Sequence, residues 1–121
     1  MAVRSRKDTL TYREDLRTNH VGGHCVFCAM QESDDIQLSS TKSFKILRNI
    51  YPYSIWDMQS VKHHIMIVPK KHTESLNDLT APEAIEFVDL IGSYESRGYN
   101  IWARAPQSNI KSIAHQHTRL I

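Results

Sequence analysis

The spacing of apolar residues predicts two strands in the middle of the chain. In residues 43–51, apolar side chains such as those of Phe44 and Ile46 alternate with polar ones, which is typical of a half-buried strand. Residues 63–68 are apolar on both faces, as expected for a central strand. Pro69 is expected to end that second strand, because proline cannot donate to the ladder of hydrogen bonds.

A helix over residues 81–97 is the best-defined element. Thr80 and Glu83 have the spacing of a capping box, and Pro82 falls in the first turn, where its missing N–H costs little. Gly98 then supplies a stop signal. The apolar residues that recur at helical spacing, and that we expect to be buried, are Ile85, Val88, Ile91 and Tyr94.

Two further strands are predicted after the helix, over residues 99–104 and 111–121. The order strand, strand, helix, strand, strand favours an α+β fold with a mostly antiparallel sheet. Residues 31–42 are hydrophilic and rich in turn-forming residues, so they are predicted to be a loop. Residues 1–22 are predicted to be a polar N-terminal arm, and residues 23–121 to form the domain.

Composition indicates one domain and gives no sign of a membrane or nucleic-acid partner. The chain has 121 residues and a formal net charge of +2, and this excess is too small to indicate nucleic-acid binding. No run reaches the roughly 18 to 20 apolar residues that cross a bilayer, and the charged N-terminus lacks the apolar stretch of a secretory signal. The two cysteines are too few for a disulfide framework, which favours a cytoplasmic location.

The cysteine pair suggests a metal site or a redox role. Cys25 and Cys28 are separated by two residues, so a single tight turn brings both thiolates to one metal ion. The pair alone is half of a tetrahedral site. A reduced pair without metal and a redox dithiol are the alternatives.

The positions of four histidines also suggest chemistry. If His115 and His117 lie in a strand, both side chains point to the same face. Three roles are then open: both bind a metal, one binds a metal and the other is reactive, or both face solvent. His64 opens an apolar strand, where an imidazole needs a metal or a hydrogen-bonding partner. His72 lies in a predicted loop and is expected to be a plain surface residue.

Three motifs together resemble those of the histidine-triad (HIT) superfamily. They are Cys25-Val-Phe-Cys28, the block HIMIVPKKH from His64 to His72, and the segment SIAHQH from Ser112 to His117. The resemblance implies a HIT-like domain with a five-stranded, mostly antiparallel sheet and one long helix packed on it. It also implies a nucleotide hydrolase or nucleotidyl transferase that cleaves dinucleoside polyphosphates or nucleoside phosphoramidates at the α-phosphate.

The resemblance further implies a zinc ion. In zinc-bearing members, two cysteines and two histidines bind one metal. Carried over to this chain, the ligands are Cys25, Cys28, His64 and His115. Four protein ligands leave no coordination position for water, so the zinc is expected to be structural.

His117 is the nucleophile that the resemblance implies. A neutral imidazole nitrogen attacks phosphorus, and water or another acceptor then cleaves the nucleotidyl-histidine. The residues expected to contact the nucleotide are Ser112, Asn49, Asn100, Gln107, Phe44 and Ile46, although the last two are equally suited to the core.

Arg119 departs from the family pattern, because most members have a third histidine at that position. Arginine stays protonated and cannot serve as a general acid at neutral pH, but it can stabilise charge on the transferring phosphate. We therefore expect Arg119 to act in catalysis, the alternative being an arginine turned to solvent. Residues 105–110 also replace the glycine-rich turn that is common before the last motif.

These motifs make a HIT-type enzyme the leading hypothesis. The alternative, which Arg119 suggests, is a non-catalytic nucleotide-binding protein on the same fold. A zinc module that binds protein or nucleic acid ranks last, because neither tryptophan is framed by a basic run. The resemblance also implies a homodimer, formed through residues 81–97 and 99–104.

Overall fold

A computed structural model describes residues 25–29, 35–49, 51–109, 111 and 113–121. The predicted N-terminal arm, residues 1–22, lies outside the described residues. Within the described part of the chain, no helix is both long and apolar enough to cross a bilayer.

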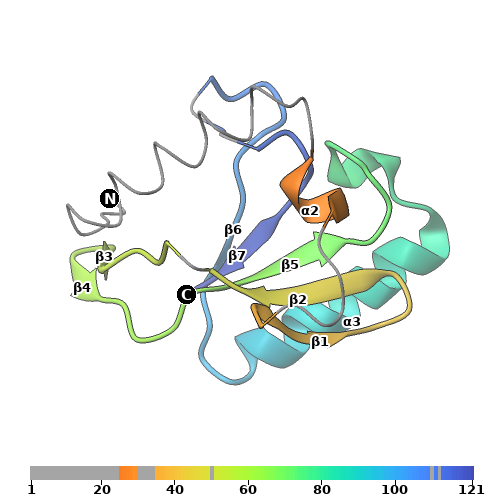
Figure 1. Ribbon diagram of the computed structural model, residues 1–121. Helices are drawn as coiled ribbons and strands as arrows, with labels where there is room; N and C mark the ends of the chain where they lie inside the picture. The colour runs from red at the N-terminus through yellow and green to blue at the C-terminus, as the bar shows by residue number, and fades with distance from the viewer. Residues whose placement is uncertain (1–24, 30–34, 50, 110, 112) are drawn as a thin grey trace.

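The centre of the fold is a five-stranded antiparallel sheet in the order β1-β2-β5-β7-β6 (Figure 1). Its strands are β1 (Gln37–Ser40), β2 (Phe44–Arg48), β5 (Ile65–Pro69), β7 (Thr118–Leu120) and β6 (Ile101–Trp102). A separate hairpin pairs β3 (Ile55–Trp56) with β4 (Gln59–Ser60). The helices are α2 (Val26–Ala29), the 3-10 turn η1 (Leu76–Asp78) and α3 (Ala81–Glu95). The predicted α+β class, with five strands and one long helix, is confirmed.

The sequence analysis missed one strand, and the last two predicted strands are shorter than expected. Strand β1 lies within residues 31–42, where the sequence predicts a loop, because an edge strand with exposed polar side chains lacks the apolar alternation that reveals a strand. Among the described residues of the predicted strand 111–121, only Thr118–Leu120 forms a strand, which Ile121 extends by two backbone hydrogen bonds to Asn100. His115 and His117 therefore precede β7 in an irregular segment.

Helix α3 begins as its sequence predicts. The Oγ1 of Thr80 accepts a hydrogen bond from the backbone N–H of Glu83 at 3.3 Å. In return, Oε1 of Glu83 accepts one from the backbone N–H of Thr80 at 2.8 Å, which completes the capping box. Gly98 follows the helix with a φ of 95°, in the left-handed region that favours glycine after a helix end.

The buried face of α3 differs from the predicted one. Phe87 is buried, whereas Ile85 and Val88 are 66% and 61% exposed. The other residues of the helix that pack on the core are Leu90, Ile91 and Tyr94. The face is rotated because the large ring of Phe87 packs on Phe44 of β2, with ring centroids 5.5 Å apart.

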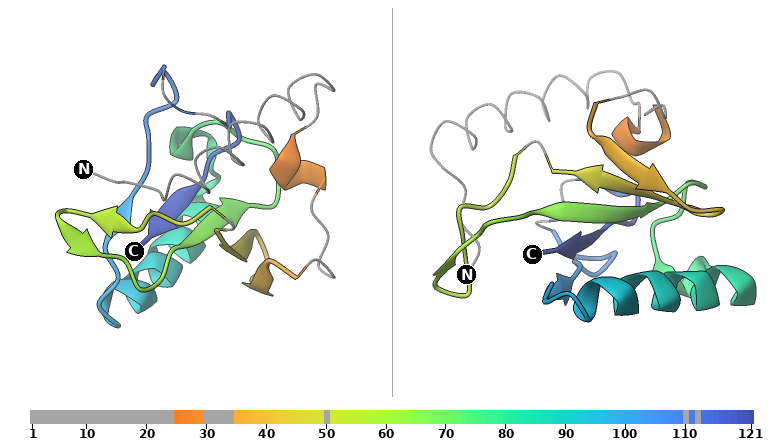
Figure 2. Two further views of the ribbon diagram at one scale, coloured as in Figure 1. Left: turned by 60° about the vertical axis from the view of Figure 1, so that its left-hand side comes forward. Right: turned by 90° about the horizontal axis from the view of Figure 1, so that it is seen from below.

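The sheet has two differently packed faces. The face covered by α3, here the α3 face, presents Phe44, Ile46, Ile65, Ile67 and Leu120. The opposite face, here the α2 face, presents Leu47, Met66 and Val68, which pack with Phe27 of α2. Figure 2 shows α3 and α2 on opposite sides of the sheet. Side chains alternate along each strand, so Arg119 points to the α2 face when its neighbour Leu120 points to α3.

Candidate functional site

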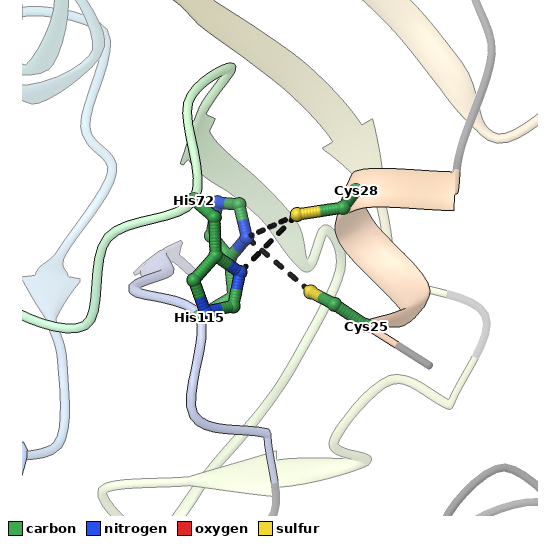
Figure 3. Close-up of side chains that lie close together, drawn as sticks. All are labelled: Cys25, Cys28, His72 and His115. Atoms are coloured by element: carbon green, nitrogen blue, oxygen red, sulfur yellow. Dashed lines mark hydrogen bonds between the residues drawn. The ribbon is translucent and has the colours of Figure 1, made fainter. Parts of the chain in front are cut away.

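Two cysteines and two histidines from distant segments come together beside α2 (Figure 3). Cys25 immediately precedes α2 and Cys28 lies in it. His72 follows β5, and His115 precedes β7. Their four candidate ligand atoms all lie within 4.8 Å of one another. Nδ1 of His115 is 3.4 Å from each sulfur, and Nδ1 of His72 is 3.2 Å from Sγ of Cys28. The group is a possible metal site.

The dimensions of this group fit zinc. In a tetrahedral site, Zn–S bonds of about 2.3 Å and Zn–N bonds of about 2.0–2.1 Å place sulfur and nitrogen roughly 3.5 Å apart. The three sulfur–nitrogen distances of 3.2–3.4 Å are close to that value. Both cysteines are free thiols, so both are available as ligands.

His115 is oriented as a metal ligand would be. Its Nε2 lies 2.8 Å from the carbonyl oxygen of Pro69, to which it donates. The proton is therefore on Nε2, and the lone pair on Nδ1 points toward the two sulfurs. Burial lowers the pKa of His115, which favours the neutral ring that a metal requires.

His64 does not lie in this group, although the sequence analysis names it as the fourth ligand. His64 is buried, its Nδ1 accepts a hydrogen bond from the N–H of Tyr53 at 3.1 Å, and its Nε2 is 3.2 Å from Nδ2 of Asn49. It precedes β5, whereas His115 is bonded to Pro69 at the other end of that strand. Five residues of strand separate the two ends by about 17 Å. His72, beyond Pro69, is the fourth candidate ligand.

Binding of a metal ion would change the protonation of the Cys28 thiol. Burial raises its pKa, and Cys25 raises it further by hydrogen bonding and by charge repulsion. The raised pKa favours the protonated form of the Cys28 thiol in the absence of a cation. A bound divalent cation reverses this preference, because its charge stabilises both thiolates.

His117 lies next to the possible metal site but is not part of it. Its Nδ1 is 2.9 Å from the carbonyl oxygen of His115, and because a carbonyl only accepts, Nδ1 carries the proton. The lone pair is therefore on Nε2. Burial lowers the pKa of His117 to about 4, with a further contribution from the charge of Arg119. At neutral pH the ring is uncharged, as a nitrogen nucleophile must be.

Arg119 is buried on the α2 face rather than turned to solvent. Its side chain is 5% exposed, and its guanidinium carbon lies 4.7 Å from the ring centroid of Trp102 and 5.2 Å from that of Tyr53. The rings of Tyr53 and Trp102 are nearly parallel, at 12°, with centroids 6.1 Å apart. Two aromatic surfaces therefore hold the cation in place.

The two apolar residues predicted to contact nucleotide are core residues instead. Phe44 and Ile46 are 0% and 1% exposed and belong to the cluster under α3. Their side chains point to the face opposite His117, so neither can contact a ligand there. The alternating direction of side chains in β2 decides this.

The polar residues predicted to bind substrate that the structure describes are not gathered around His117. Asn49 is buried beside His64, and its Oδ1 accepts a hydrogen bond from the N–H of Tyr51 at 2.8 Å. Asn100 is exposed, and its backbone pairs with Ile121, at the end of β7 away from His117. Gln107 is exposed in a turn, and Ser112 lies outside the described residues.

The sequence analysis missed four residues of this region: His72, Phe27, Tyr53 and Trp102. Phe27 contacts the rings of both His115 and His117, at centroid distances of 5.7 and 5.3 Å. His72 closes the HIMIVPKKH block, so the motif contained the signal. No local pattern in the sequence indicates that two rings surround Arg119. Trp102 lies beside Arg119 only because β6 pairs with β7.

Comparison with known proteins finds similarity in structure alone. No protein-family model and no curated protein matches the chain. A HIT family hydrolase from Legionella pneumophila Philadelphia 1 superposes with a TM-score of 0.58 at 18% identity, over 81% of this chain and 91% of that one. A Zn-bound histidine triad family protein from Mycobacterium smegmatis gives 0.60 at 23% identity, over 82% and 74%.

A histidine triad nucleotide-binding protein from Candida albicans also matches, with a TM-score of 0.52 at 20% identity, over 81% of this chain and 73% of that one. Identities this low reveal a common fold, and residue roles do not follow from them. The chain therefore has the fold of the histidine triad (HIT) proteins.

Proposed function

We propose that this protein is a nucleotide hydrolase or nucleotidyl transferase that cleaves its substrate at the α-phosphate through a covalent intermediate on His117. The observation that carries the proposal is the state of that imidazole. Its Nδ1–H is held by the carbonyl oxygen of His115, and its Nε2 keeps the lone pair at neutral pH. The comparisons support the proposal, because the proteins of like fold include a HIT family hydrolase and a histidine triad nucleotide-binding protein.

The residues of the α2 face have distinct roles in this proposal. His117 Nε2 attacks phosphorus, and the ring becomes positively charged while its proton stays on Nδ1, which donates it to the carbonyl oxygen of His115. Arg119 supplies a fixed positive charge on the same face, where it stabilises negative charge that develops on the transferring phosphate.

The metal site has a positioning role. Cys25, Cys28, His72 and His115 would hold a zinc ion, which would supply structural cross-linking and no coordination position for substrate. Because His115 also provides the carbonyl that orients His117, fixing His115 fixes the tautomer of the nucleophile. A site of reduced thiols suits a reducing compartment, and we propose the cytoplasm.

The test compares the wild type with His117→Ala, on a diadenosine polyphosphate and on adenosine 5′-phosphoramidate. We expect His117→Ala to abolish turnover, and mass spectrometry without acid treatment to find a nucleotidyl group on His117 of the wild type. His63→Ala is the matched control, because His63 is an exposed histidine that contacts Tyr99. Equal turnover by the wild type and His117→Ala would refute the proposal.

A non-catalytic nucleotide-binding protein is the second candidate, and Arg119 in place of the third histidine favours it. It predicts nucleotide binding in calorimetry, with no turnover and no modified histidine. The turnover measurement above decides between the two candidates.

We also propose that the protein forms a homodimer through α3. Ile85 and Val88 lie one turn apart and expose their apolar side chains, a pair that a second copy would cover. Light scattering should give twice the monomer mass, and Ile85→Ser with Val88→Ser should reduce it to one. A monomer mass for the wild type would contradict this proposal.

A further inference from the structure

The position of Arg119 is fixed by its neighbours in the sheet. The antiparallel register places Trp102 of β6 on one side of Arg119 and Met66 of β5 on the other. Tyr53 adds the second aromatic surface, 5.2 Å from the guanidinium carbon. A buried arginine that contacts two rings in this way keeps its charge at one place on the α2 face.

Arg119 lies beside the reactive histidine. The two residues are two positions apart, and both belong to the α2 face, where Arg119 pairs with Met66 and the ring of His117 contacts Phe27 at a centroid distance of 5.3 Å. Lys111 directs its ammonium group toward another loop, because its Nζ donates to the carbonyl oxygen of Glu74 at 3.2 Å. Arg119 is therefore a cation that is held in place beside His117.

We infer that Arg119 determines which leaving groups the site accepts: it admits nucleoside phosphoanhydrides, whose leaving group departs as a stable anion, and discriminates against nucleoside phosphoramidates, whose leaving amine needs a proton. The inference rests on the proposed function and narrows its substrate class.

The chemistry of the first step explains this preference. The lone pair of His117 Nε2 forms a bond to the α-phosphorus, and the bond from phosphorus to the leaving group breaks, with its electron pair leaving on the departing atom. In an anhydride that atom is a phosphate oxygen, whose pKa of about 6 makes the anion stable at neutral pH. In a phosphoramidate the atom is nitrogen, and an amide anion is far too basic to leave without a proton.

Arginine assists the departure of the phosphate oxygen of an anhydride but not that of the nitrogen of a phosphoramidate. Its guanidinium stabilises an anionic oxygen by charge and by hydrogen bonds, but it does not give up a proton near neutral pH. In the second step, water attacks the phosphorus, loses a proton to solvent, and the phosphorus–Nε2 bond breaks to return the lone pair to His117. That step is the same for both substrates, so the difference between them arises in the first step.

The experiment measures kcat/KM at pH 7 for a diadenosine polyphosphate and for adenosine 5′-phosphoramidate. We expect the wild type to favour the anhydride by at least about 100-fold, the lower end of what a general acid contributes. Arg119→His introduces a group that can donate a proton and should shift the ratio toward the phosphoramidate by about tenfold or more. Arg119→Gln removes the charge without adding an acid, so it should slow anhydride cleavage and leave the phosphoramidate slow.

The outcomes separate the inference from the proposed function. Comparable turnover of both substrates by the wild type, or a ratio that Arg119→His leaves unchanged, would overturn the inference while leaving the covalent mechanism intact. Turnover of neither substrate would refute the proposed function, and the inference with it.

Discussion

The two faces of the sheet bury different kinds of side chain. The α3 face buries a large apolar cluster, and the one polar strand residue buried on it, Thr118, accepts a hydrogen bond from Gln116 at 2.9 Å. The α2 face buries polar side chains beside a smaller apolar cluster, among them Asn49, His64, His117 and Arg119. A buried polar group is costly unless it has a partner, and the partners here come from loops and aromatic rings. One face therefore mainly stabilises the fold, and the other holds the candidate functional site.

The largest expected loss of stability comes from a substitution in the core of the α3 face. Phe44→Ala removes a fully buried ring that packs on Phe87, so it should lower the free energy of unfolding by about 3–5 kcal/mol. Denaturant unfolding measures the loss. Glu95→Ala, at an exposed position near the end of α3, is the control, expected to change stability by no more than about 0.5 kcal/mol. Similar values for the two variants would mean that the α3 face is not the main source of stability.

Removing a bound metal ion from the α2 face should lower the stability of the protein. An ion present at 100 times its Kd adds about 2.7 kcal/mol to stability, so the chelated protein should melt at a lower temperature than the zinc-loaded one. Cys28→Ser should abolish this response to zinc.

Substitution of His72 and of His64 tests which histidine belongs to the metal site. His72→Ala should lower the zinc content of the purified protein, whereas His64→Ala should retain zinc, because His64 lies with Asn49 and Tyr53. The reverse result, zinc lost in His64→Ala and kept in His72→Ala, would contradict the ligand set.

A smaller effect is expected in the polar network of the α2 face. Asn49→Ala leaves the N–H of Tyr51 and the ring of His64 without their contacts to the amide, which should cost about 1–3 kcal/mol. Asn100→Ala is the matched control, because Asn100 is exposed and donates only to the carbonyl oxygen of Ile121 from its side chain. If both variants unfold at the same denaturant concentration, the network has no structural importance.

The smallest effect is expected at the start of α3. Lys71, 2.8 Å away, and the N–H of Thr80 lower the pKa of Glu83 to about 2. The carboxylate thus contributes stability above its unfolded pKa of about 4.5, and this contribution is lost as the pH falls toward about 2. The difference in stability between the wild type and Glu83→Gln should shrink from pH 7 to pH 3. A constant difference would show that this carboxylate does not titrate with folding.

Local features of the structure were predictable from the sequence. The capping box of Thr80 and Glu83 involves residues three apart, and the strand before Pro69 is one apolar run. The helix face was predicted with the wrong rotation, since Ile85 and Val88 have the right spacing but Phe87 finds the better contact. Spacing shows that a helix is amphipathic, but the shape of its neighbour selects which apolar side chains are buried.

The sequence by itself determined the class of the fold, its long helix and three of the four candidate metal ligands, Cys25, Cys28 and His115, because these follow from local spacing or from motifs. Only the tertiary structure decided that His72 rather than His64 joins them, and that Trp102 and Tyr53 hold Arg119. The contact between Cys28 and His72 joins residues 44 positions apart, and the contact between Cys25 and His115 joins residues 90 positions apart. Such contacts depend on strand register and on which end of β5 meets α2, and no local pattern contains that information.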